Sequence, residues 1–325
     1  MVDFRSGPGK LLRLLFKAIG QHHDEFEATY DLSDLAYQPA ADLIRNGLLQ
    51  KKPFAISRFG YSELRAVLTY LHINEHSPYI RKLFAFARGR KVEPWWDQQT
   101  IKIITYNAGV FPIDTEVVER YCRLALADLP VFDALGSWLG GERIIKPLMP
   151  DCKFIRFHDF YHFLHERPWT SALEGQRVLV IHPFAKSIEN QYARRKFIYH
   201  APHTLPDFEL NTYQAIQSIA GNQPTGYATW FDALEKMKND ISALAFDVAI
   251  IGCGAYGMPL AAFIKREMQK KAIHLGGNTQ ILFGIKGSRW ENDPEFAPIF
   301  NEHWVRPLPQ ETPQGHQNID SNSYW

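Results

Sequence analysis

Short apolar runs that alternate with helical patterns constrain the fold of this chain more than any other feature. Residues 53–56, 177–181 and 247–251 are mostly apolar, each run is followed by a turn and a helical pattern, and residues 272–275 form a fourth run. Strands that are buried on both faces of a sheet have this character, and their alternation with helices is typical of parallel strands. The sequence therefore predicts an α/β fold, a Rossmann-like parallel sheet with helices on both faces.

Helical periodicity fills most of the chain between these runs. It predicts helices over residues 33–49, 63–71, 114–139, 229–244 and 259–271, and a further helix that follows residue 184 and ends near residue 195. Thr229 and Asp232 form a capping box for one of them. Residues 20–31 are polar and no later linker is evident, so we expect an N-terminal amphipathic helix and linker (1–31) and a single domain (32–325). The tail after Trp290 is expected to wrap the surface.

The charge balance and the cysteines exclude several classes of protein. The 325 residues include 36 Lys and Arg against 35 Asp and Glu, so we expect no nucleic-acid partner. No apolar run reaches the roughly 18 residues that a membrane span needs. Three widely spaced cysteines (Cys122, Cys152 and Cys253) form neither a disulfide framework nor a zinc pattern, which favours a reducing compartment and a cytoplasmic location.

Residues 10–19 (KLLRLLFKAI) have the pattern of an amphipathic helix with Lys10, Arg13 and Lys17 on one face. The charges within the apolar stretch, and the lack of a small-residue cleavage site, argue against a secretory signal. Two interpretations remain open. The commoner one is a terminal helix docked on the body of the protein. The other is a helix lying on an anionic membrane, which would make the protein peripheral at the inner membrane face.

Residues 252–257 have the spacing G-x-G-x-x-G between a predicted strand and a predicted helix. Ligands bind such sheets at the carboxyl ends of the strands, and glycines let a phosphate approach the backbone amides. We therefore expect Gly252, Gly254, Tyr256 and Gly257 to bind a diphosphate, the alternative being that the glycines serve close packing. No acid lies within residues 272–277, where a dehydrogenase or an S-adenosylmethionine-dependent methyltransferase would need one for the ribose.

Other candidate site residues lie in two further turns and in the segment RFHDFYH. Arg58, Gly60 and Glu63 follow the first run, and they offer a guanidinium for phosphate and a carboxylate for a metal ion or a sugar hydroxyl. Alternatively, Glu63 only caps its helix and pairs with Arg58. His182 ends another predicted strand and is a candidate base, phosphate ligand or packed polar residue. Asp159 is a further candidate base.

Several separated segments carry a family likeness in order along the chain. They are SRFGYSEL (57–64), VLVIHPF and SIENQY (within 178–192), DVAIIGCGAYGMPLAAFIK (247–265), AIHLGGNTQILFGIKGSRW (272–290), HWVRP (303–307) and SYW (323–325). Together they resemble the bacterial glycosyltransferases of GT-D fold, over nearly the whole chain after residue 31. The resemblance implies a GT-D-type Rossmann-like fold and the transfer of a hexose from a nucleotide diphosphate sugar, a UDP-sugar foremost. The implied acceptor is a glycan or lipid-linked glycan in bacterial surface polysaccharide or glycoprotein synthesis.

The resemblance also implies an Asp-x-Glu metal motif, in which Tyr61 replaces the Asp and Glu63 remains. Mn²⁺ or Mg²⁺ is the expected cofactor if Glu63 holds a metal ion. Otherwise Arg58 or Lys186 would balance the charge of the leaving diphosphate. Trp290 is a candidate for stacking on a base or sugar. The alternative functions are those of a non-catalytic nucleotide-sugar-binding protein of the same fold and of an S-adenosylmethionine-dependent methyltransferase.

Overall fold

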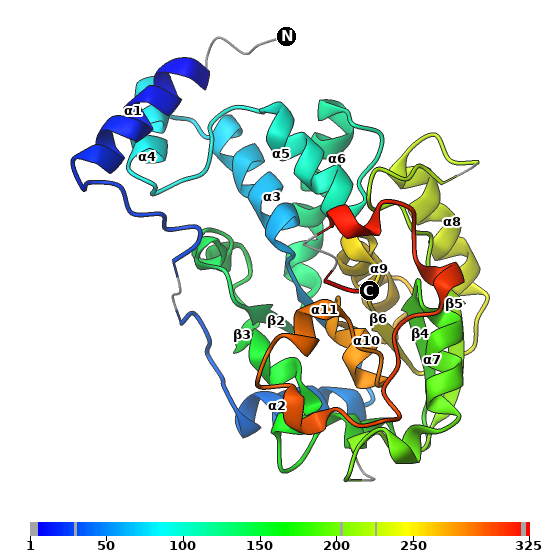
Figure 1. Ribbon diagram of the computed structural model, residues 1–325. Coiled ribbons are helices and arrows are strands. Elements are labelled where there is room, and N and C mark those ends of the chain that lie inside the picture. The colour runs from blue at the N-terminus through cyan, green and yellow to red at the C-terminus, as the bar shows by residue number, and fades with distance from the viewer. Residues whose placement is uncertain (1–5, 29–30, 202–203, 225, 320–322) are drawn as a thin grey trace.

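A seven-stranded, wholly parallel sheet forms the centre of the molecule (Figure 1). The computed structural model describes residues 6–28, 31–201, 204–224, 226–319 and 323–325. The strands are β1 (Phe54–Arg58), β2 (Ala134–Ser137), β3 (Lys153–Arg156), β4 (Arg177–His182), β5 (Glu209–Gln214), β6 (Val248–Ile251) and β7 (Lys271–His274). Their order in the sheet is β3-β2-β1-β7-β6-β4-β5. The predicted α/β, Rossmann-like fold is confirmed.

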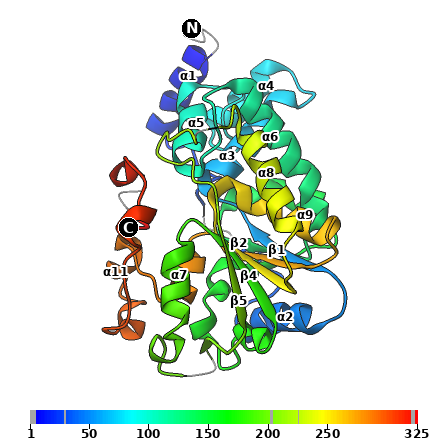
Figure 2. The same cartoon turned by 90° about the vertical axis from the view of Figure 1, so that its right-hand side faces the viewer.

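Helices cover both faces of this sheet, because alternate side chains along each strand enter different cores. On β4, Leu179 and Ile181 join one hydrophobic cluster, whereas Val178 and Val180 join the other. The first core also takes residues from α3 (Tyr61–Asn74), α6 (Thr115–Asp128), α8 (Trp230–Ser242) and α9 (Gly257–Arg266). The second takes residues from α2 (Gln38–Leu49), α7 (Ala185–Tyr192) and α10 (Asn278–Leu282). Figure 2 shows α8 and α9 on one side of the strands and α2 and α7 on the other.

The four predicted strands correspond to the central strands β1, β4, β6 and β7, whereas β2, β3 and β5 were not predicted. The helix expected over residues 114–139 is wrong in its second half, since α6 ends at Asp128 and β2 follows. Pro130, two residues later, has no amide to continue the α-helical hydrogen bonds, and residues 129–131 form a short 3-10 turn instead. The other predicted helices exist but differ from the observed ones at their ends. The largest differences are that α2 starts only at Gln38 and that α9 ends at Arg266. The predicted capping box of Thr229 and Asp232 is confirmed at the start of α8.

The N-terminal helix α1 (Ser6–Ala18) packs on α4 (Tyr79–Ala87), as the docked interpretation predicts. Phe16 is buried there and meets the ring of Phe84 edge to face, with 6.1 Å between the ring centroids. The expected linker is partly packed, since Phe26 is also buried. No helix in the described ranges combines the length and apolar character needed to cross a membrane. The remaining α-helices among the described residues are α5 (Gln98–Ile103) and α11 (Ser288–Glu291).

The tail after Trp290 packs against the molecule through buried aromatic side chains rather than through long helices or strands. Trp304 and Trp325 belong to the second core, and Val305 forms a parallel bridge with Ile285. The last residues also line the cavity described below. The tail therefore contributes to the site as well as to the surface.

Candidate functional site

A cavity of about 490 Å³ lies at the carboxyl ends of the central strands. Arg58 of β1, His182 of β4 and His274 of β7 reach its wall, as does Gly252, which follows β6. The chain leaves β1 toward β2 and β3 on one side of the sheet, and leaves β4 toward β5 on the other. A reversal of this kind opens a crevice in which α/β proteins bind ligands. The cavity is also of the size that holds a small molecule or cofactor.

Arg289 also lines this cavity. Arg58 is the cation that β1 contributes to it. Its guanidinium lies over the ring of Trp138, 5.5 Å from the ring centroid, and over Phe157 at 5.1 Å. Its Nε is buried without a hydrogen-bond partner, and no described residue forms an ion pair with it. Arg58 therefore does not pair with Glu63, contrary to the alternative interpretation of these two residues. A guanidinium held by aromatic rings beside an open cavity can accept an anion.

Glu63 is the carboxylate of the cavity, and no other Asp or Glu occurs among the described residues that line it. It lies in the first turn of α3, is 8% exposed, and accepts a hydrogen bond of 2.9 Å from Ser62 Oγ. It does not cap the helix, because the N-cap residue is Gly60 and no side chain caps this end. A Cβ at Gly60 would collide with the Glu63 carboxylate, so glycine leaves room for the acid.

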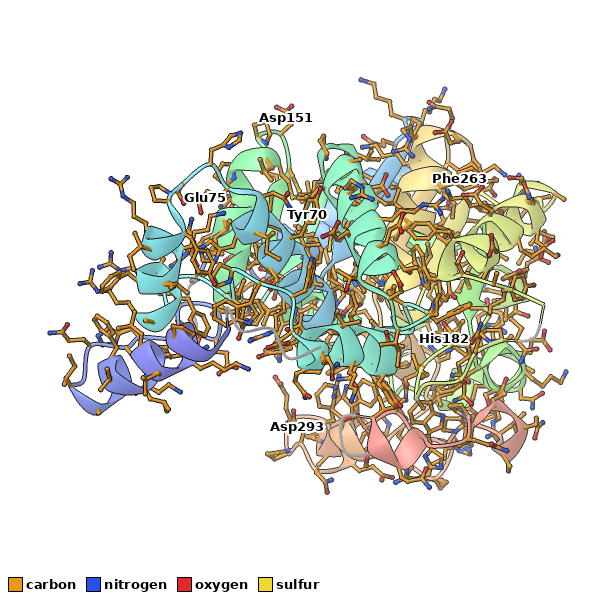
Figure 3. The ribbon with its side chains drawn as sticks, turned by 90° about the horizontal axis from the view of Figure 1, so that it is seen from above. Tyr70, Glu75, Asp151, His182, Phe263 and Asp293 are labelled. Carbon is orange, nitrogen blue, oxygen red and sulfur yellow. The ribbon has the colours of Figure 1, made fainter. Side chains whose placement is uncertain are left out.

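Two buried histidines line the cavity in neutral form. His182 Nδ1 accepts a hydrogen bond of 3.0 Å from the Phe184 amide, and His274 Nδ1 lies 2.9 Å from Ser57 Oγ. Burial lowers the pKa of each histidine to about 3, and Arg58 adds to this effect at His274. With Nδ1 of His182 used as an acceptor, the proton of the neutral ring resides on Nε2. This geometry favours His182 as a hydrogen-bond donor rather than as the base that the sequence indicated. Figure 3 shows it among closely packed side chains, beside the C-terminal segment.

The glycine turn meets the cavity only in part. Gly252 and Gly254 line it, whereas Gly257 does not. A Cβ at Gly252 would lie 2.5 Å from the Gly276 carbonyl oxygen, and one at Gly257 would overlap the His274 ring. Close packing therefore accounts for Gly252 and Gly257. Gly254 has a φ of +60°, a backbone conformation that favours glycine.

Tyr256 also lines the cavity and is held firmly. Its ring stacks on Trp230, with 4.9 Å between centroids, and its hydroxyl lies 3.1 Å from Ser218 Oγ. Burial raises the pKa of the phenol. The side chain is thus a neutral, fixed wall element next to the glycine turn.

Three other predicted residues lie away from the cavity. Asp159 is fully buried and does not line the cavity. Its carboxylate accepts hydrogen bonds from Arg156 Nη2 at 2.7 Å and from the Tyr37 amide at 2.8 Å. These contacts tie down the loop after β3, so Asp159 cannot serve as a base in this cavity. Trp290 is buried in the second core, and Lys186 pairs with Glu189 on the surface.

Trp138 is the most prominent site residue that the sequence analysis missed. It follows β2, is 40% exposed, lines the cavity, and donates from Nε1 to the Phe59 carbonyl at 2.9 Å. Its amide also donates to the buried Glu142, whose pKa burial raises to about 7. Because β2 was not predicted, no pattern indicated that Trp138 follows a strand end. Asn107 and Ala108 were missed as well, and both belong to a π-helical turn, Ile104–Ala108.

The residues present do not form the metal site that the resemblance implies. No cluster of three or more His, Cys, Asp or Glu side chains suited to a metal ion occurs in the part of the chain that the structure describes. Tyr61, in place of the Asp, donates from its hydroxyl to Glu27 at 2.8 Å, and burial raises its pKa. Glu63 alone supplies too few ligands for a divalent cation.

Comparisons of the chain with protein-family models, curated proteins and solved structures gave no match.

Proposed function

We propose that this protein is a glycosyltransferase that uses a nucleotide diphosphate sugar as donor and a glycan or lipid-linked glycan as acceptor. The observation that carries the proposal is Arg58, a cation without an anionic partner among the described residues, on the wall of a cavity that also holds Glu63. The cavity lies where sheets of this kind bind nucleotides. The resemblance of the sequence motifs to GT-D glycosyltransferases supports the same function.

Three lining groups, Arg58, Glu63 and His182, have polar roles in this proposal. The bond between the anomeric carbon and the phosphate oxygen breaks, and the acceptor oxygen forms a bond to that carbon. Arg58 balances the charge that develops on the diphosphate. Glu63 takes the proton that the acceptor hydroxyl loses, because it is the carboxylate at the cavity wall. His182 donates a hydrogen bond from Nε2 to the bound ligand.

Trp138 supplies a flat, half-exposed ring beside Arg58 on which a base or sugar can stack. We assign no step to a metal ion, since the donor set around Glu63 does not fit one. The proposal therefore places the task of neutralising the leaving group on the cavity cations, Arg58 and Arg289, and on neutral hydrogen-bond donors.

A nucleotide-sugar-binding protein without turnover is the second candidate. Tyr61 favours it, because a phenol bound to Glu27 stands where the resembled family has a metal-binding Asp. This candidate keeps the same ligand and the same cavity but lacks transfer.

Release of nucleoside diphosphate distinguishes the two candidates. The full chain is incubated with UDP-sugars and a panel of glycan acceptors, with and without Mn²⁺ or Mg²⁺, and donor binding is titrated in parallel. The glycosyltransferase proposal predicts acceptor-dependent release of UDP, also in the absence of divalent ions. Donor binding without release would favour the binding protein, and no binding of any nucleotide sugar would refute both.

A further inference from the structure

The paired helices α1 and α4 project together at one end of the molecule and expose apolar side chains (Figure 1). Gly9, Phe16, Leu83 and Phe86 face inward and are buried. The outward side carries large apolar residues, each at least 40% exposed: Leu11, Leu14, Leu15, Ile19, Ile80 and Phe84. We call these six residues the apolar patch. Burying it in another apolar medium would be favourable, and no described segment of the chain covers it.

The charged residues of α1 and α4 are all positive. Neither α1 nor α4 contains an Asp or Glu, and Lys10, Lys17, Arg81 and Arg88 are all exposed there. None of these four cations forms an ion pair with a described residue, and Arg88 lies over the ring of Phe16 at 5.3 Å.

The other two cations of the helix pair are used within the protein. Arg13 pairs with Asp24 at 2.8 Å, and Lys82 Nζ donates to the Ile73 carbonyl at 2.7 Å. The inward cations are thus satisfied internally, whereas the outward ones are available to an external anion.

We propose that α1 and α4 form a docking surface for an anionic lipid membrane. Apolar side chains flanked by long cationic side chains match the boundary between acyl chains and anionic headgroups. The lysine and arginine stems can lie along the apolar surface while their charged ends reach the phosphates. A second copy of this chain is a poorer occupant, because two such faces would bring like charges together.

Ionic contacts link this surface to the helix that begins at the cavity. Arg13 of α1 lies 3.8 Å from Glu93, which also binds Arg65 of α3 through contacts of 2.6 and 2.7 Å. The first turn of α3 carries Glu63. The membrane-docking helices are therefore tied to the helix that begins at the cavity, so a docked molecule presents its cavity in a defined orientation.

Vesicle co-sedimentation of the full chain tests the proposal. The probes are phosphatidylcholine vesicles and vesicles of phosphatidylcholine mixed with phosphatidylglycerol, each at low and high salt. One variant combines Lys10→Glu with Lys17→Glu, and another combines Leu11→Gln with Leu14→Gln. A control variant combines Leu49→Gln, Lys51→Glu and Lys52→Glu. These residues, at and just after the end of α2 and remote from α1, are also exposed apolar and basic residues.

We expect binding to the anionic vesicles that weakens at high salt and that falls about tenfold or more in either α1 variant. The control variant should bind as the unaltered protein does, and thermal unfolding curves should match, because every changed side chain is exposed. The proposal is overturned if the unaltered protein ignores anionic vesicles or if the control loses as much binding. A concentration-dependent dimer that the α1 variants abolish would instead identify a second copy as the occupant.

Discussion

Arg58 is the residue proposed to bind the diphosphate, so its removal should weaken that binding directly. Each hydrogen bond to a charged group contributes about 1.5–3 kcal/mol, and Arg58→Ala should therefore weaken UDP binding roughly 10- to 100-fold. Isothermal titration measures the affinity. The control is Arg123→Ala, which removes a half-exposed arginine on α6. Unchanged UDP affinity in Arg58→Ala would show that Arg58 does not bind the nucleotide.

Glu63→Gln tests the role of the cavity carboxylate while keeping its shape. The amide oxygen can still accept the hydrogen bond from Ser62, so we expect the fold and donor binding to persist. Loss of a proton acceptor should slow transfer roughly 10²-fold or more, as measured by UDP release. Glu116→Gln, an exposed residue in the first turn of α6, is the matched control. Equal rates in Glu63→Gln and the unaltered protein would exclude Glu63 from the chemistry.

Glu142 makes a pH-dependent contribution to the free energy of unfolding, which a comparison with Glu142→Gln can measure. Burial raises its pKa from 4.5 to about 7 in the folded protein. The unfolded chain therefore loses this proton first, and the contribution of Glu142 to stability is full below pH 4.5 and is lost as the pH rises through about 7. A shift of this size corresponds to about 3 kcal/mol.

Glu142→Gln should remove this dependence. In urea unfolding at acidic and mildly alkaline pH, we expect the variant to gain stability relative to the unaltered protein as the pH rises. A difference between the two proteins that stays constant across this range would contradict the raised pKa.

At the scale of elements, Gly257 tests whether the glycine turn serves packing. A Cβ there would overlap the His274 ring, where α9 begins against β7. Gly257→Ala should therefore destabilise the protein by about 1–3 kcal/mol in urea unfolding. Gly7→Ala is the matched control, because a Cβ at Gly7 meets nothing within 4 Å. A stable Gly257→Ala protein with weakened nucleotide binding would mean that this glycine serves the ligand.

The same elements explain which parts of the fold the sequence could predict. The central strands are buried on both faces, so β4 and β6 read as continuous apolar runs. The edge strand β5 has the sequence ELNTYQ and is partly exposed, and β2 has only four residues, among them Gly136 and Ser137. Neither has a pattern that distinguishes it from a loop or from the end of a helix. Trp138 was missed for this reason, since its place in the site follows from β2.

At the scale of the whole molecule, folding brings together residues whose spacing along the chain does not predict that they are neighbours. Arg58 and Glu63 were identified because Arg58 ends a recognisable strand and Glu63 follows it closely, and both line the cavity. Asp159 was proposed from its neighbours in the sequence, yet the nearby Arg156 and the remote Tyr37 amide use both of its oxygens. The tail residues Ser323 and Tyr324 reach the cavity from the far end of the chain. Only packing of the complete fold determines such neighbours.

A crystal structure of the protein with UDP would test the central claim most directly. The account predicts that the diphosphate lies in the cavity at the carboxyl ends of β1, β4, β6 and β7, with phosphate oxygens within hydrogen-bond distance of the Arg58 guanidinium. A nucleotide bound elsewhere, or bound with Arg58 still stacked on Trp138 and no phosphate beside it, would contradict the account.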